Sequence, residues 1–218
     1  MNINYTVIDF TTYKRRDHYN HFLQMDNPFI TMTCDIDVTN YLNNAKKNNY
    51  PFFLYFQYAV VNVANNIKEF KQRIKKGKIV EFDHCDASYI LATEDGTYRY
   101  CNVPCNIDLN DYFKYSKEKE LETLNQEHLI EEGDPDQYFY TTCLPWTSYS
   151  SLSFPTSNNK FSVPSFGWGK YYAENYIDDD GNVEKRYKMP VTVMVNHALV
   201  DGKQVCDFFN NLQNYINL

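Results

Sequence analysis

The sequence predicts a two-layer sandwich of the α+β or α/β class, in which helices pack against a mixed sheet. Three observations predict this class. Segments with strand-like and helix-like patterns alternate along all 218 residues. Neither an internal repeat nor a low-complexity linker interrupts them. The apolar fraction of 43% and the charged fraction of 22% are those of an ordinary globular protein. We therefore expect a single domain spanning residues 1–218.

In the first half of the chain, capping and helix-breaking residues separate the apolar patterns. Thr11 or Thr12 can cap a helix, Pro28 ends it, and Pro51 opens a second helix that is apolar on most faces. The predicted elements are a strand over Asn4–Phe10, a helix over Thr12–Met25, a strand over Phe29–Ile36, a short helix over Asn40–Lys47 and a buried helix over Pro51–Ile67.

In the second half, strands predominate. The basic run KQRIKKGK, Lys71–Lys78, is interpreted as a solvated helix end. The last two strands are expected to form a hairpin that turns through residues 178–181. The predicted elements are strands over Lys78–Phe82, Ser88–Thr93 and Tyr98–Val103, a charged helix over Leu109–Leu129, strands over Gln137–Cys143, Ser148–Phe154, Trp168–Tyr176 and Val183–Val195, and an amphipathic helix over Val205–Ile216.

The composition narrows the class of partners. A net charge of −7 argues against nucleic acid as the main partner. No apolar stretch approaches the ~20 residues of a membrane span, and the N-terminus lacks a secretion-signal pattern, so we expect a cytoplasmic protein with no membrane partner. Its six cysteines are expected to be reduced thiols. The 20 Tyr, 15 Phe and 2 Trp favour large interfaces and hence an oligomer.

Several catalytic or metal-binding patterns are missing or incomplete. His18 and His21 stand three residues apart on a predicted helix, but HExxH spacing and a third ligand are lacking. Cys101 and Cys105 form one pair without a second, so a zinc site is not expected. The chain contains neither a glycine-rich phosphate loop nor a GxSxG nucleophile turn.

The stretch VMVNHALVDGKQV places His197 in an otherwise apolar strand, four residues before Asp201. From the pattern alone there are two interpretations. His197 is either a structural histidine that caps the core or a general base, because imidazole can accept a proton near neutral pH. Asp201 has the ordinary interpretation of a helix N-cap, which is compatible with either.

The HxxxDG pattern formed by His197, Asp201 and Gly202 resembles that of chloramphenicol acetyltransferases and related CoA-dependent acyltransferases. Other stretches resemble further segments of this family in the family's order, so the resemblance spans Asn4–Ile216 and is to its trimeric, bacterial, single-domain type. They are DFTTYKRRDHYNHF, NNYPFFLYFQYAV, LPWTSYSSL and FGWGKYY.

The resemblance implies a mixed sheet with helices packed on one side, and acetyl transfer from acetyl-CoA to a hydroxyl of chloramphenicol, which inactivates the antibiotic. In this scheme His197 is the general base and Ser148 stabilises the oxyanion. Asp201 pairs with Arg15 and holds the turn that carries the histidine. No acyl-enzyme and no metal ion are needed.

The resemblance also implies how ligands and subunits are arranged. We expect a homotrimer with its sites at the subunit interfaces, where one subunit supplies the histidine and its neighbour supplies much of the acceptor pocket. The expected coenzyme contacts are Lys170, Tyr171 and Tyr50, and the expected contacts to the acceptor are Phe22, Asn27, Tyr98 and Gly167.

The chain departs from the family pattern at several of these positions. Asn196 stands where the family has a first histidine, and Lys203 follows Gly202 where the family has an aromatic residue. Phe22 replaces a tyrosine and Gly167 replaces a threonine. Two alternatives therefore stand beside chloramphenicol: an acetyltransferase for another small hydroxyl compound, and a non-catalytic ligand-binding trimer of the same fold.

Overall fold

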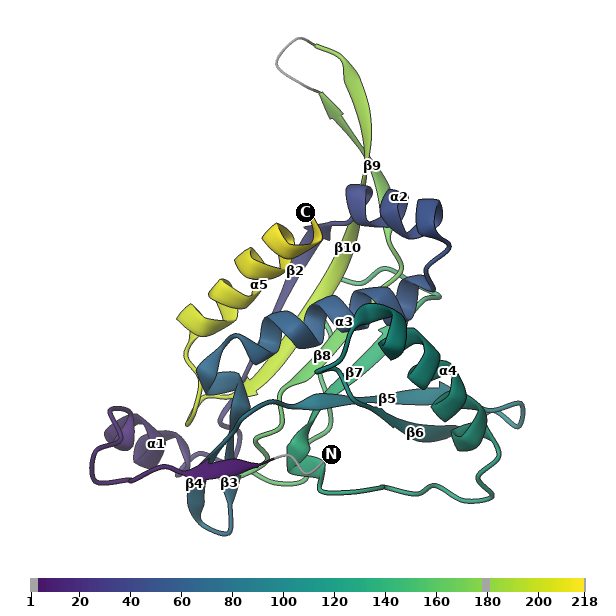
Figure 1. Ribbon diagram of the computed structural model, residues 1–218. Coiled ribbons are helices and arrows are strands. Elements are labelled where there is room, and N and C mark those ends of the chain that lie inside the picture. Colours follow the sequence, from purple (N-terminus) through teal and green to yellow (C-terminus); the bar gives the residue numbers. More distant parts are fainter. Residues whose placement is uncertain (1–3, 178–180, 218) are drawn as a thin grey trace.

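A mixed sheet forms the centre of the molecule (Figure 1). The computed structural model describes residues 4–177 and 181–217. The strands pair in the order β2-β10-β8-β7-β5-β6, and β9 pairs with the first part of β10. The pairs β8/β7 and β7/β5 are parallel and the others are antiparallel. The strands are β2 (Phe29–Asp37), β5 (Asp86–Ala92), β6 (Tyr98–Val103), β7 (Tyr138–Leu144), β8 (Ser165–Gly169), β9 (Tyr172–Ile177) and β10 (Val183–Asn196).

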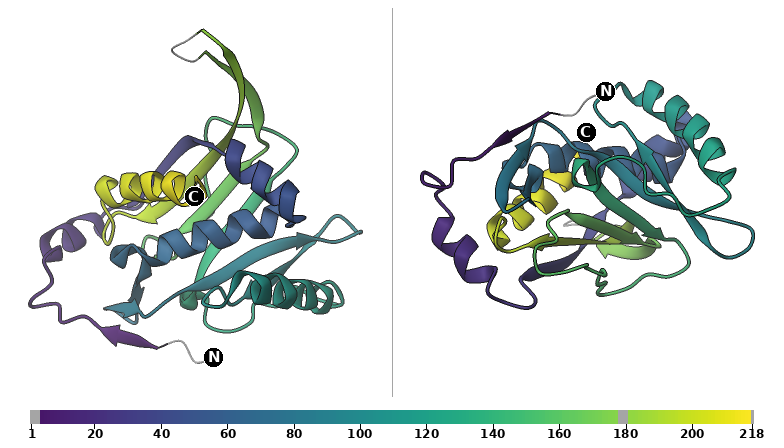
Figure 2. Two further views of the ribbon diagram at one scale, coloured as in Figure 1. Left: turned by 45° about the horizontal axis from the view of Figure 1, so that its top comes forward. Right: turned by 90° about the horizontal axis from the view of Figure 1, so that it is seen from below.

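Four helices cover one face of this sheet (Figures 1 and 2). They are α2 (Thr39–Asn48), α3 (Phe52–Asn65), α4 (Leu109–Leu124) and α5 (Gly202–Ile216). Asn49 adopts the left-handed conformation that ends α2, and Pro51 precedes α3. Because α3 is apolar all round, most of its side chains are buried between the sheet and the neighbouring helices. The predicted sandwich of a mixed sheet with helices on one side is confirmed.

The other face of the sheet is covered by a segment without regular strands, residues 145–164. The predicted strand over Ser148–Phe154 is therefore wrong. Both edges of β8 are occupied by β7 and β10, so this segment cannot pair with β8. It lies over the sheet instead, with Leu152 and Phe154 packed above Gly167.

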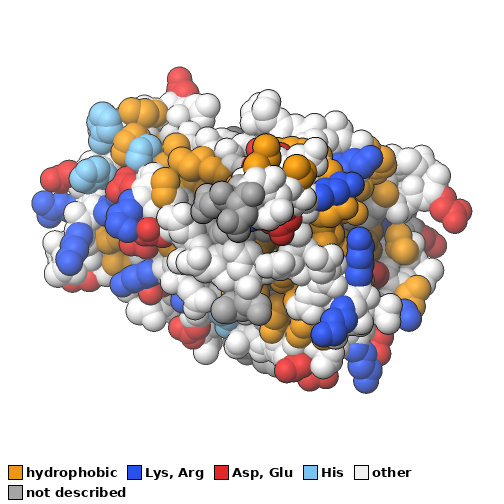
Figure 3. All heavy atoms as spheres, turned by 90° about the horizontal axis from the view of Figure 1, so that it is seen from above, with side chains coloured by type: hydrophobic (Ala, Val, Ile, Leu, Met, Phe, Trp, Pro, Cys, Tyr) orange, Lys and Arg blue, Asp and Glu red, His pale blue; other side chains and the backbone are white. Residues whose placement is uncertain are grey.

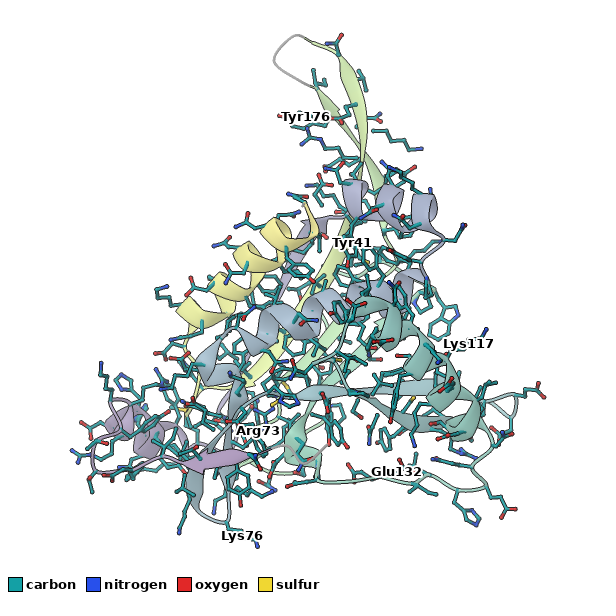
Figure 4. The ribbon with its side chains drawn as sticks, in the orientation of Figure 1. Tyr41, Arg73, Lys76, Lys117, Glu132 and Tyr176 are labelled. Carbon is teal, nitrogen blue, oxygen red and sulfur yellow. The ribbon has the colours of Figure 1, made fainter. Side chains whose placement is uncertain are left out.

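A small antiparallel sheet packs beside the main one, with the order β1-β4-β3. Its strands are β1 (Tyr5–Val7), β3 (Gln72–Lys75) and β4 (Lys78–Phe82), and a short 3-10 helix, η1 (Lys68–Lys71), precedes it. The interpretation of Lys71–Lys78 as a helix end is wrong, because this run forms the β3–β4 hairpin. Arg73 lies inside the molecule while Lys76, with φ of 50°, lies at the hairpin turn (Figure 4).

Arg73 can be buried because its guanidinium donates hydrogen bonds to the carbonyl oxygens of Phe70, Gln72 and Tyr138. A basic run thus contributes a core residue, which its composition does not reveal.

Several boundaries differ from the prediction. The first strand and the first helix are shorter than expected, since α1 spans Arg16–Phe22, and the charged helix α4 ends at Leu124 rather than Leu129. The predicted strand Trp168–Tyr176 is divided into β8 and β9, because Lys170 leaves the sheet and donates its backbone N–H to Thr147. A second 3-10 helix, η2, spans Pro135–Gln137. Most of the predicted turn at residues 178–181 lies outside the described residues.

The β9–β10 hairpin projects from the body, with Tyr176 on its outer part (Figures 1 and 4). Charged side chains of both signs occur on the face seen from above (Figure 3). Within residues 4–177 and 181–217, no helix is long and apolar enough to cross a membrane. All six cysteines are free thiols; three of them are buried and Cys206 is exposed.

Candidate active site

His197 occupies the first position after β10, where the chain leaves the sheet and enters α5. Its backbone N–H donates to the carbonyl of Pro28 at 2.7 Å, which fixes the end of β10 against the start of β2. The N–H groups of Leu199 and Val200 both donate to the carbonyl of Asn196 at 3.0 Å. The stretch HALV is therefore a tight turn that presents one side chain in a defined direction.

The imidazole of His197 is held on one edge and one face. Its Nδ1 lies 3.0 Å from the carbonyl oxygen of Val200 and 3.3 Å from Oδ1 of Asp201. Since both partners are acceptors, Nδ1 is the donor in these contacts, and in the neutral ring the lone pair is then on Nε2. Phe22 stacks on the ring, with 3.8 Å between centroids and 18° between planes. The side chain remains 30% exposed.

Arg15 connects this turn to the N-terminal part of the chain through an ion pair and a hydrogen bond. Its guanidinium pairs with the carboxylate of Asp201 and donates to the carbonyl of His197 at 2.9 Å. The Arg15 side chain is only 14% exposed, so water screens the interaction weakly. Asp201 also stands at the N-cap of α5, where Gln204 accepts a hydrogen bond from its backbone N–H at 3.1 Å. The predicted Arg15–Asp201 contact is present.

The structure does not bring Ser148 to this histidine. A side chain on Gly169 would lie 2.9 Å from the carbonyl oxygen of Thr147 and 3.0 Å from Pro190, so Ser148 lies beside that end of β8 and β10. Pro190 and His197 are seven residues apart on one extended strand, which corresponds to roughly 23 Å. Within one chain, these two predicted catalytic groups are therefore well separated.

The segment that carries Ser148 contains further serines that the sequence prediction did not single out. Ser150 and Ser151 line a hollow over the sheet with Thr31 and Thr33. Between Ser148 and Ser150, the ring of Tyr149 points to the sheet, where its hydroxyl accepts from Thr192 at 3.3 Å and burial raises its pKa. With Ser153, which lines the same hollow, four exposed serines thus lie within residues 148–154, where the sequence pattern pointed to one.

An aromatic pocket of about 380 Å³ opens on this face of the sheet. Tyr98, one of the predicted acceptor contacts, lines it, and none of its lining side chains is charged. Gly167 lies at its margin, beneath Leu152 and Phe154 and next to Thr142. The lining residues are Ser88, Tyr89, Ile90, Tyr98, Tyr100, Tyr140, Thr141, Thr142, Phe154, Pro155, Phe161, Ser165 and Phe166, and His197 is not among them.

The other predicted acceptor contacts lie near the histidine rather than at the pocket. Phe22 stacks on the imidazole as described above. Asn27 is exposed in the loop before β2, and its carboxamide oxygen accepts from the N–H of Phe29 at 3.4 Å.

The predicted coenzyme contacts gather elsewhere. Tyr50 and Tyr171 line one groove of about 520 Å³, at the start of α3, together with Lys46 and Asn49. Lys170 is exposed and precedes Tyr171 in the chain. Two aromatic side chains and an ammonium group are suited to a ligand with a flat ring and phosphates.

Metal ligands are not clustered in the part of the chain that the structure describes: no group of three His, Cys, Asp or Glu side chains could hold an ion there. His18 and His21 are exposed on α1, and Cys101 and Cys105 are buried in the core.

Solved structures show which class of fold this is. A chloramphenicol acetyltransferase structure superposes with a TM-score of 0.79 and 21% identity, covering 98% of this chain and 100% of that one. A probable dihydrolipoamide acetyltransferase from Listeria monocytogenes superposes with a TM-score of 0.67 and 15% identity, covering 97% of this chain and 94% of that one. The fold is that of these acyltransferases.

The comparison of sequences gives the family. The family model for chloramphenicol acetyltransferase matches residues 3–213. A chloramphenicol acetyltransferase of Proteus mirabilis is 26% identical over 211 residues, which cover 96% of this chain and 93% of that protein. A chloramphenicol acetyltransferase of Vibrio anguillarum is 26% identical over 220 residues, which cover 98% of this chain and 95% of that protein. The chain belongs to the chloramphenicol acetyltransferase family and is an acyltransferase, as the sequence resemblance predicted.

Proposed function

We propose that this acyltransferase moves the acetyl group of acetyl-CoA directly to the hydroxyl of a small acceptor, with chloramphenicol as the first candidate. The observation that carries the proposal is the hydrogen bond from Nδ1 of His197 to the carbonyl of Val200. It supports a tautomer in which Nε2 is free to act as a base. Chloramphenicol is the acceptor named for the relatives from Proteus mirabilis and Vibrio anguillarum.

In the proposed reaction, Nε2 of His197 removes the hydroxyl proton while the acceptor oxygen attacks the thioester carbonyl. A tetrahedral intermediate with an oxyanion forms. Its collapse breaks the carbon–sulfur bond, and the leaving thiolate of CoA takes the proton from the imidazolium. The products are the acetyl ester and free CoA, and His197 returns to its starting state.

A serine hydroxyl donates to the oxyanion in this scheme, and two serines are candidates. Ser148 has the support of the sequence resemblance. Ser151 has the support of its neighbours, because the adjacent Leu152 lies above Gly167 at the margin of the aromatic pocket. Replacement of the true donor by alanine should cost roughly 100- to 1,000-fold in kcat, and replacement of the other should cost little.

Acetyl-CoA is proposed to bind in the groove lined by Tyr50 and Tyr171, with Lys170 near its phosphates. The aromatic walls suit the adenine ring, and the ammonium groups suit the phosphates. No metal ion takes part in the proposed reaction.

We propose a homotrimer of single-domain chains with its sites between subunits. The separation of His197 from Ser148, and its absence from the lining of the aromatic pocket, support a base that acts on an acceptor held by a neighbouring copy. A site between two copies requires that both surfaces be present at each interface, as in a closed ring of identical subunits.

A different small alcohol is the second candidate acceptor. Phe22 lies against the imidazole without the hydroxyl that the family pattern has there, so one polar contact to the acceptor is lost. Loss of such a contact can change discrimination between alcohols. The aromatic pocket, which has no charged lining residue, favours an uncharged acceptor.

The test is thiol release from acetyl-CoA with chloramphenicol and with a panel of small neutral alcohols. His197→Ala should lower turnover by a factor of ~10³ or more, while the exposed His18→Ala serves as the matched control. Turnover of another alcohol but not of chloramphenicol would support the second candidate. A chain that neither binds acetyl-CoA nor releases thiol with any alcohol would contradict the proposal.

A further inference from the structure

Asn196, which directly precedes His197, is a buried polar residue whose carboxamide nitrogen and oxygen both form hydrogen bonds. The residue is 3% exposed. The carboxamide nitrogen donates to the carbonyl oxygens of Asn159 at 3.0 Å and Phe161 at 2.9 Å. Its oxygen accepts from the backbone N–H of Ala198 at 2.9 Å. A buried amide that satisfies three groups of the main chain holds those groups in fixed positions.

A second amide extends this contact to the N-terminal part of the chain. The side-chain nitrogen of Asn159 donates to the carbonyl oxygens of Leu23 and Met25, both at 3.1 Å. Asn159 and Asn196, here called the asparagine clamp, therefore tie together three segments that are far apart in the sequence.

Each of the three segments carries a residue of the proposed site. Residues 23–25 directly follow Phe22, whose ring stacks on the imidazole. Phe161 forms part of the wall of the aromatic pocket. His197 lies between Asn196 and Ala198, both of which take part in the bonds of the clamp. The direction of Nε2 and the position of the pocket wall thus depend on the same pair of side chains.

We propose that Asn196, acting with Asn159, is a positioning residue for acetyl transfer. This inference rests on the proposed function. The clamp touches no substrate; it acts by holding the turn that carries the base, and the segment that carries the pocket wall, in fixed positions. In the proposed trimer, each clamp joins the histidine of one site to the pocket wall of the next. The coenzyme groove lies at the other end of the strands and is independent of it.

The kinetic test uses Asn196→Ala, and Asn159→Ala as a second variant in an irregular segment. We expect kcat/KM for the acceptor to fall by about 10- to 100-fold, because a displacement of about 1 Å has this effect on a positioned base. The KM for acetyl-CoA should not change. Equal changes in both KM values would overturn the proposal, since they would indicate a general loss of structure.

The matched control is Asn65→Ala. Asn65 makes the same kind of contacts, donating to the carbonyl oxygens of Val61 and Cys85 and accepting from the N–H of Cys85. None of the residues it contacts belongs to the proposed site. It should lower the melting temperature without changing either KM. If it reduces kcat/KM for the acceptor as much as Asn196→Ala does, the clamp has no special role.

Hydrogen exchange measured by mass spectrometry tests the clamp without any acceptor. Backbone amides of residues 157–162 and 23–28 should exchange faster in Asn196→Ala than in wild type, and should be unchanged in Asn65→Ala. If the wild type turned over no alcohol, the proposed function would fail, but the exchange measurement would still show whether Asn196 holds these segments in place. Unchanged exchange of both segments in Asn196→Ala would refute the proposed role of the asparagine clamp.

Discussion

Replacement of Arg15 by methionine removes the guanidinium that joins the start of α1 to the turn carrying His197, while it keeps most of the side-chain volume. Two interactions are lost, the ion pair with Asp201 and the bond to the carbonyl of His197. Exposed ion pairs contribute ~0–1 kcal/mol, and breaking a buried one costs ~3–5 kcal/mol.

The exposed fractions of the two side chains decide where this ion pair falls between the exposed and the buried case. They are 14% for Arg15 and 38% for Asp201, so the pair is intermediate, and we assign it about 2 kcal/mol. A bond from a charged donor to a carbonyl adds about 1.5 kcal/mol. The total of roughly 3.5 kcal/mol corresponds to a melting temperature about 7–14 °C below that of wild type for a chain of this size.

The assay is thermal unfolding, with Arg16→Met as the control. The Arg16 side chain is 52% exposed and its partner Asp17 is 89% exposed, with 3.6 Å between the charged atoms. The control should therefore stay within ~1 kcal/mol of wild type. We also expect kcat of Arg15→Met to fall while the KM for acetyl-CoA is unchanged. Equal melting temperatures for the two variants would refute the assignment of Arg15 to the turn.

Two further predictions concern the core. Gln57→Leu should lower the free energy of unfolding by about 1–3 kcal/mol in urea, because the buried Gln57 amide accepts from the Tyr112 hydroxyl, and a buried hydroxyl that loses its partner costs ~1–3 kcal/mol. Thr141, to which Gln57 donates, still donates to the carbonyl of Ser88 at 3.3 Å. An unchanged free energy of unfolding would show that the Tyr112 hydroxyl finds another partner. Burial raises the pKa of the Cys143 thiol from 9.0 to about 11, so the stability gained by keeping it neutral is complete below pH 9 and is lost as the pH rises through about 11. Cys143→Ala should therefore lose less stability than wild type between pH 9 and pH 11. Curves of unfolding free energy against pH that run parallel for the two proteins would contradict this. At pH 8 a thiol reagent should modify the exposed Cys206 first, and Cys206→Ser should remove this fast phase.

The elements that could be predicted from the sequence are those whose local pattern agrees with their environment. The helix α5 follows the spacing of Val205, Phe208 and Leu212, and α3 follows Pro51 as a long apolar run. The strand β3 was missed because the burial of Arg73 depends on carbonyl oxygens supplied by distant segments. The strand predicted at 148–154 has an alternating pattern, but this segment lies over the face of β8, both edges of which are already paired.

The candidate site likewise has residues that could be predicted from the sequence and residues that could not. His197, Asp201 and Arg15 could be recognised because their spacing matches a family pattern, and the structure places them together. The roles of the Val200 carbonyl and of the Asn196 carboxamide could not be predicted, since they depend on how a turn and two loops meet in space. Asn196 looked like a defect in the family pattern, whereas in the structure its amide is fully used.

The most direct test of the account mixes two inactive chains, one with His197→Ala and one with alanine at whichever of Ser148 and Ser151 proves essential. If the base acts on an acceptor held by a neighbouring copy, some interfaces in a co-refolded sample pair an intact histidine with an intact serine. For random mixing at equal amounts, this is about one quarter of the interfaces of a closed ring. The mixed sample should therefore release thiol at roughly a quarter of the wild-type rate. Activity no higher than that of the separate variants would contradict it.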